Sequence, residues 1–180
     1  MLSMPVVATT PFAYPRLYAL HSMPADAGTP LTADPSKPLP PGITDIAGFA
    51  GIRLPPTETL SAASLESTGA YLLDDGIESF LWIGQDAPEP LVRSLLGLPS
   101  VKDMDTSGLP FRKLDSPLNR RVHAILGALA DAAAQLPRLR VVRQGAADAL
   151  EARFHWRLVE DRQGFTGSLA YGDYLALLAR

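Results

Sequence analysis

The chain contains no cysteine among its 180 residues. This excludes disulfides, thiolate catalysis and cysteine-ligated zinc, and it fits a reducing compartment. Charged side chains are also scarce, at 19% of the residues, and the formal net charge is only -3. Because a nucleic-acid or acidic membrane surface attracts a strongly basic face, the charge balance gives no electrostatic case for either partner.

Long apolar runs are missing as well. No stretch approaches the roughly 18 apolar residues of a membrane-spanning helix, and the first residues lack the positive and apolar regions of a signal peptide. We therefore expect no direct membrane insertion. The chain nevertheless begins with the apolar segment Met4-Pro5-Val6-Val7, which is unusual for a soluble protein. We interpret residues 1–13 as the remnant of a preceding segment of a longer protein.

The common catalytic and nucleotide-binding motifs are absent from the sequence. There is no phosphate-binding G-x-x-x-x-G-K-[ST] loop, no G-x-S-x-G elbow and no H-E-x-x-H pair. The three histidines, His21, His123 and His155, are far apart and have no neighbouring ligand pattern. The sequence therefore predicts no catalytic residue and no cofactor-binding residue.

One segment imitates a metal site. Residues 103–108 read D-M-D-T-S-G, which matches the first six positions of a calcium-binding loop. Such a loop needs a bidentate Glu at its twelfth position, and Leu114 stands there instead. We interpret the segment as a polar turn and predict no metal-ligating residue.

The most regular passage is residues 69–84, G-A-Y-L-L-D-D-G-I-E-S-F-L-W-I-G. Two apolar runs flank Asp74-Asp75-Gly76, which predicts strands over residues 71–74 and 80–83 joined by an exposed turn at Asp75-Gly76. We expect the apolar side chains of both strands to be buried, and Trp82 to be at least partly covered. Adjacent carboxylates in an exposed turn lack a third group to separate their pKa values, so the pair is interpreted as structural.

The remaining pattern predicts a sheet with helices. We expect a strand at residues 14–21, helices at 89–96, 118–136 (after a Ser116-Pro117 start), 147–160 and 169–180, and a strand at 139–142. The helix over 147–160 is expected to bury Leu150, Phe154 and Leu158, with Trp156 as a further candidate on the same face. Residues 24–56 are rich in Pro and are interpreted as a long connecting insert that carries a weak apolar island at 43–54. This order of elements predicts an α/β or α+β sandwich.

Two arginines stand at an unfavourable place. Arg120 and Arg121 lie in the first turn of the long helix, where the helix dipole disfavours cations. Either both side chains are simply solvated, or they face an acidic partner surface.

Seven segments together resemble a known family. They are YPRLYALH, TGAYLLDDGIESFLWIG, EPLVRSLLGLPSV, LDSPLNRRV, LRVVRQG, FHWRLVEDR and SLAYGDYLALL. In order and spacing, this succession resembles the C-terminal gelsolin-like domain of the cargo-adaptor subunit of the COPII vesicle coat. The resemblance covers residues 14–180 and is broken only by the insert at about 24–56. It implies a gelsolin-like α/β (α+β) fold with a mixed sheet between one long helix and shorter ones.

The resemblance also implies a function. The domain would be a non-catalytic structural part of a coat subunit that acts in cargo selection and vesicle formation between the endoplasmic reticulum and the Golgi, on the cytoplasmic side of the membrane. Its partners would be the other domains of the parent subunit, the heterodimeric coat partner and, indirectly, cargo proteins. Residues 1–13 would then be the end of the preceding helical segment. Phe12, Tyr14, Arg120 and Arg121 are the candidate interface residues.

The alternative is a calcium-regulated, actin-binding gelsolin module. Calcium sites of that type use an acidic residue of the long helix near the hairpin carboxylate. Between residues 118 and 136 the only acidic residue is Asp131, near the end of the expected helix.

Overall fold

The computed structural model describes residues 11–30, 51–102, 104, 108–133 and 138–161. They form a five-stranded sheet in the order β2-β1-β3-β4-β5. The strands are β1 (Arg16–Ala19), β2 (Thr57–Glu58), β3 (Ala70–Asp74), β4 (Glu78–Ile83) and β5 (Arg138–Arg143). All neighbouring pairs are antiparallel except β4 and β5, which are parallel, so the sheet is mixed.

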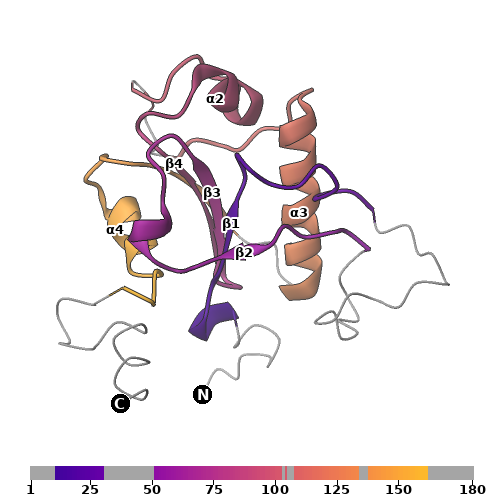
Figure 1. Ribbon diagram of the computed structural model, residues 1–180, viewed down its shortest axis with the longest axis horizontal. Helices are drawn as coiled ribbons and strands as arrows, with labels where there is room; N and C mark the ends of the chain where they lie inside the picture. Colours follow the sequence, from indigo (N-terminus) through magenta and orange to yellow (C-terminus); the bar gives the residue numbers. More distant parts are fainter. Residues whose placement is uncertain (1–10, 31–50, 103, 105–107, 134–137, 162–180) are drawn as a thin grey trace.

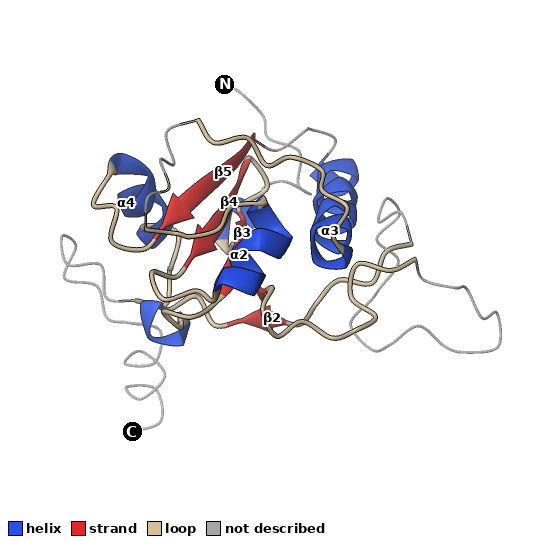
Figure 2. Cartoon of the chain, turned by 90° about the horizontal axis from the view of Figure 1, so that it is seen from above, coloured by secondary structure: helices blue, strands red, loops and turns tan. Residues whose placement is uncertain are grey.

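Helices cover both faces of this sheet. The helical elements are η1 (Ala62–Ser64), α2 (Glu89–Leu96), α3 (Pro117–Ala133) and α4 (Ala149–His155). Helices α2 and α3 pack on one face, and the short α4 packs on the other (Figures 1 and 2). The α+β architecture, with a mixed sheet between a long helix and a shorter one, confirms the fold class expected from the sequence.

The hairpin β3–β4 forms the centre of both cores. Because successive strand residues point to opposite faces, Leu72, Leu81 and Ile83 pack toward α3, whereas Phe80 and Trp82 pack toward α4. The exposed fraction is 0% for Leu72, Leu81 and Ile83 and 1% for Trp82. The predicted burial of this hairpin is therefore confirmed, and it follows from a sheet that is covered on both faces.

The turn of the hairpin was predicted wrongly. Asp75 is fully buried and Asp74 is 4% exposed, so the exposed tip is Ile77 instead. The Asp75 side chain folds back over the turn and accepts the backbone N–H groups of Ile77 and Glu78, at 2.8 and 2.6 Å. The Asp75 carboxylate therefore stabilises the turn from inside the fold and is not exposed on its surface.

Helix α4 is shorter than expected, and this changes the place of Trp156. Asp148 caps the helix by accepting the N–H of Glu151 at 2.8 Å, and the helix ends at His155. Phe154 and Leu158 are buried as predicted, but Trp156 is 77% exposed because it follows the last helical residue. The expected helix at 169–180, the end of the helix at 118–136 and most of the apolar island at 43–54 lie outside the described residues.

The borders of the Pro-rich insert belong to the folded domain. The N–H of Gly28 donates to the carbonyl of Arg53 at 2.7 Å, and an antiparallel bridge joins Pro30 to Ile52. Gly28 has φ of +76°, and a Cβ there would lie 2.8 Å from Cβ of Arg121. The insert therefore leaves and re-enters the domain at one place, directly against α3.

Candidate interaction surfaces

Four large apolar side chains are exposed among the described residues. They are Phe12, Tyr14, Ile77 and Trp156, with exposed fractions of 42%, 51%, 40% and 77%. Phe12 and Tyr14 are candidate interface residues from the sequence, whereas Ile77 and Trp156 are not. We call this set, together with Arg157, the aromatic face.

Arg157 connects the members of the aromatic face. Its guanidinium carbon lies 5.4 Å from the centroid of the Phe12 ring, which is a cation–π distance. Its Nη2 lies 2.9 Å from Oδ2 of Asp75, an ion pair that is too bent to count as a hydrogen bond. Arg157 thus contacts Phe12 and Asp75 directly, while Ile77 donates its N–H to Asp75 and Trp156 directly precedes Arg157 in the chain.

A second link holds the N-terminal part of this face. The hydroxyl of Tyr14 donates to Oε1 of Glu160. The N–H of Glu160 in turn donates to the carbonyl of Leu60 at 3.0 Å, and Asp161 accepts from the Ser61 hydroxyl at 2.7 Å. Residues far apart in the sequence thus fix the aromatic face on the side of the sheet that α4 covers.

The two hairpin carboxylates have separate structural tasks. Asp75 serves the turn and Arg157, while Asp74 accepts the hydroxyl of Ser79 at 3.1 Å. Burial raises the pKa of Asp74 above its ordinary value, against the opposing effects of Ser79 and Arg16. Within the described part of the chain, no group of three or more histidine and acidic side chains is placed to hold a metal ion.

Arg120 and Arg121 have different environments. Arg121 turns toward the insert, where its Nε donates to the carbonyl of Ala27 at 2.6 Å and its Nη2 donates to that of Pro24. Arg120 is exposed and lies 3.2 Å from Asp115. Both arginines belong to α3, on the opposite side of the sheet from the aromatic face, so the structure does not unite the four candidate interface residues in one surface.

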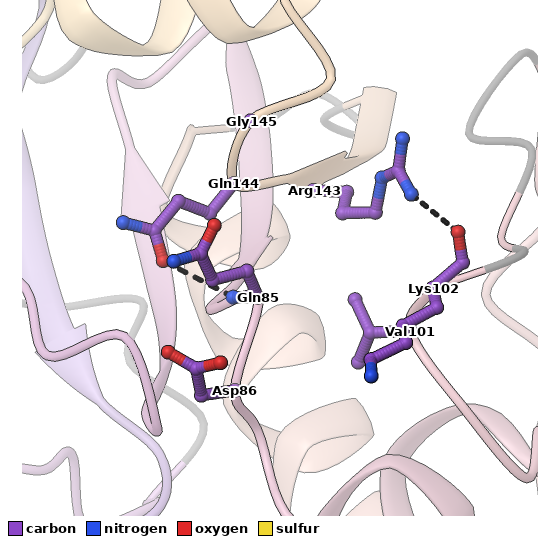
Figure 3. A pocket seen from close by; sticks show the side chains of 7 residues that line it. All are labelled: Gln85, Asp86, Val101, Lys102, Arg143, Gln144 and Gly145. Carbon is purple, nitrogen blue, oxygen red and sulfur yellow. Dashed lines mark hydrogen bonds between the residues drawn. The ribbon is translucent and has the colours of Figure 1, made fainter.

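A polar pocket of about 420 Å³ lies where β4 and β5 end (Figure 3). The N–H of Gln85 donates to the side-chain oxygen of Gln144 at 3.1 Å, and Nη1 of Arg143 donates to the carbonyl of Lys102 at 2.6 Å. These bonds tie the strand ends to the loop after α2. No sequence pattern indicates this pocket, because its lining residues come from three separate segments.

A sequence model of the Gelsolin repeat family matches residues 51–126. The crystal structure of the human COPII-coat protein Sec24c matches 98% of this chain and 20% of its own chain, with a TM-score of 0.73 and 29% sequence identity. The chain therefore contains a gelsolin-like domain.

Relatives with similar sequences are named as protein transport proteins. The chain is 34% identical to protein transport protein sec24 of Schizosaccharomyces pombe over 170 residues, which is 93% of this chain. It is 32% identical to SEC24 of Coccidioides immitis over 166 residues, which is 89% of this chain. The resemblance seen in the sequence is confirmed: this is a gelsolin-like domain related to the COPII coat protein Sec24. The chain spans 16% of the length of each of these two relatives.

Among the described residues, no helix is long and apolar enough to cross a membrane.

Proposed function

We propose that this chain is a non-catalytic structural domain of a COPII-type coat subunit. Its work is part of cargo selection and vesicle formation for protein transport from the endoplasmic reticulum to the Golgi, on the cytoplasmic side of the membrane. The observation that carries the proposal is the agreement with Sec24 proteins in both sequence and fold over nearly the whole chain.

The aromatic face suits a contact with another part of the coat subunit or with its heterodimeric coat partner. Trp, Tyr and Arg are the residues that most often dominate the energy of protein interfaces. Here Trp156 projects from a helix end, while Phe12 and Arg157 hold each other in place. A contact surface that is already ordered loses less entropy when its partner binds.

A chimera in the fission yeast protein tests the proposal. The matching region of S. pombe sec24 is replaced by this chain, and the export of a secreted reporter from the endoplasmic reticulum is measured. We expect export to continue, and we expect Trp156→Ser to reduce it. Arg93→Ser is the matched control, because Arg93 is an exposed side chain of α2 on the opposite side of the sheet. A folded, expressed chimera that fails to export the reporter would refute the proposed role.

The actin-binding alternative has less support. Both oxygens of Asp75 are engaged within the domain, and Asp131 is an exposed residue near the end of α3. Co-sedimentation with filamentous actin, with and without calcium, distinguishes the two functions. We expect no calcium-dependent co-sedimentation, and its appearance would favour the alternative.

A further inference from the structure

Three basic side chains line one pocket beside the start of α3. The pocket has a volume of about 310 Å³ and is lined by Lys113, Asn119, Arg120, His123 and Ala124. It lies on the α3 side of the sheet, away from the aromatic face. None of these lining residues is acidic, so the pocket presents positive charge to a ligand.

The walls of the pocket are fixed by a buried amide. Asn119 is fully buried, and its Oδ1 accepts the N–H of Leu114 at 2.9 Å. Its Nδ2 donates to the carbonyls of Leu95 and Arg112, at 2.8 and 3.0 Å. The segment that carries Lys113 is thereby held against the first turns of α3, where Arg120 and His123 lie. The three cationic or titratable groups are therefore brought together before any ligand arrives.

His123 has an unmet hydrogen-bonding capacity. Its ring stacks on Phe111 with centroids 4.5 Å apart and planes at 20°. Its Nε2 is buried and has no hydrogen-bond partner among the described residues. Because buried polar groups are nearly always hydrogen-bonded, a small rotation of this pocket-lining ring toward a ligand atom would give Nε2 the partner that it lacks.

Arg120 has only a weak internal partner. Its Nη1 lies 3.2 Å from Asp115, whose side chain is 97% exposed. An ion pair at such an exposed site contributes little, so an incoming carboxylate can share or replace Asp115 at small cost. An anion would also relieve the unfavourable position of Arg120 at the positive end of the helix dipole.

We propose that this pocket binds a carboxylate-rich peptide segment of a partner protein. The cationic side chains carry the recognition here, whereas a phosphate site at a helix start uses a cradle of free backbone N–H groups. At this helix start Pro117 has no N–H, and the N–H of Asn119 donates to the Ser116 hydroxyl at 3.5 Å. The methyl group of Ala124 in the lining suits the aliphatic stems of acidic side chains.

The test uses a fluorescein-labelled oligoglutamate peptide and the full chain, with binding followed by fluorescence anisotropy. Lys113→Glu with Arg120→Glu should weaken binding roughly tenfold or more, since two charge-assisted contacts are lost. The control is Lys102→Glu with Arg138→Glu, which changes the net charge equally but lies near β5. We expect the control pair to bind nearly as well as the parent chain. His123→Phe keeps a ring on Phe111 but removes Nε2, and it should weaken binding while the melting temperature stays unchanged.

Several results would overturn this site. One is equal weakening by the two charge-reversal pairs, which would mean unspecific attraction. Another is displacement of the peptide by inorganic phosphate at a similar concentration, which would mean a small-anion site. Absence of peptide binding to a folded chain would also reject it. If the reversal at Lys113 and Arg120 prevents folding, the Gln variants of both residues give the same comparison. The chimera experiment does not use these residues, so the two proposals fail independently.

Discussion

Replacing Asp75 by Ala should reveal how much the hairpin turn depends on one buried carboxylate. The substitution removes the acceptor of two backbone N–H groups and leaves Arg157 without its ion-pair partner. A buried donor without a partner costs about 1–3 kcal/mol. Ile77 is 40% exposed, so water reaches part of this turn, and the lower end of that range applies to each N–H group.

Loss of the ion pair with Arg157 adds a smaller amount to the free-energy cost of Asp75→Ala. Breaking a fully buried pair costs about 3–5 kcal/mol, but the side chain of Arg157 is 30% exposed and its charge is partly solvated. We therefore expect Asp75→Ala to lower the free energy of unfolding by about 3 kcal/mol in total. For a domain of this size, that corresponds to a fall in melting temperature of about 6–12 °C.

Two further variants separate the turn from the ion pair. Asp75→Asn keeps an oxygen for the two N–H groups and removes only the charge, so it should cost about 1 kcal/mol. Arg157→Met should cost more, about 3 kcal/mol, because it leaves the fully buried Asp75 carboxylate without its ion-pair partner. The double variant Asp75→Asn with Arg157→Met should cost less than the sum of the two. Urea denaturation followed by the fluorescence of the buried Trp82 measures all four variants. If Asp75→Ala costs less than about 1 kcal/mol, the carboxylate is not what holds the turn.

Three other predictions concern stability. Because burial raises the pKa of Asp74 in the folded state, its contribution is present in acid and is lost as the pH rises from about 4 through that raised pKa. In urea melts, the free energy of unfolding of Asp74→Asn should therefore rise relative to that of the parent chain as the pH increases. A difference between the two that stays constant with pH would contradict this. Gly84→Ala places a Cβ 2.0 Å from the carbonyl oxygen of Ser67 and should cost about 3 kcal/mol, whereas Gly127→Ala meets no atom within 4 Å and should stabilise by about 0.5–1 kcal/mol. Replacing residues 31–50 by a short turn should leave stability unchanged or raise it by about 1 kcal/mol, and a loss of several kcal/mol would show that the segment is part of the core.

The sequence predicted the parts of the fold that have a local cause. The apolar runs around Leu72 and Trp82, and the Ser116-Pro117 start of α3, are visible within a few residues. The burial of Asp75 is not visible in this way, because the side chain that covers it is Arg157, which lies far along the chain. The same holds for Arg121, whose partners are backbone carbonyls of the insert.

On the surfaces too, residues with a local sequence signal were predicted, and residues placed by distant contacts were not. Phe12 and Tyr14 were singled out because the chain is expected to enter the domain there from the preceding segment, and the structure does expose them. Trp156 was misplaced because helical spacing suggested burial, while the helix ends one residue earlier. Arg120 was singled out by its conflict with the helix dipole. Its neighbours His123 and Lys113 were not, because the buried amide of Asn119 brings them together through contacts that no spacing rule shows.

During synthesis of the protein, β1 remains unpaired until the strands that flank it in the sheet have been made. This first strand lies in the interior of the sheet, between β2 and β3, although both of its neighbours come much later in the chain. Ala19 pairs with Tyr71, so at about 5–20 residues per second roughly 3–10 s pass between the synthesis of one and that of the other. During this interval Leu17, Tyr18 and Leu20, all buried in the finished domain, have no sheet to join. The hairpin β3–β4 needs only local pairing, so it is the first surface on which β1 can settle. Until then the nascent chain carries an unpaired apolar strand, which is the kind of segment that chaperones shield.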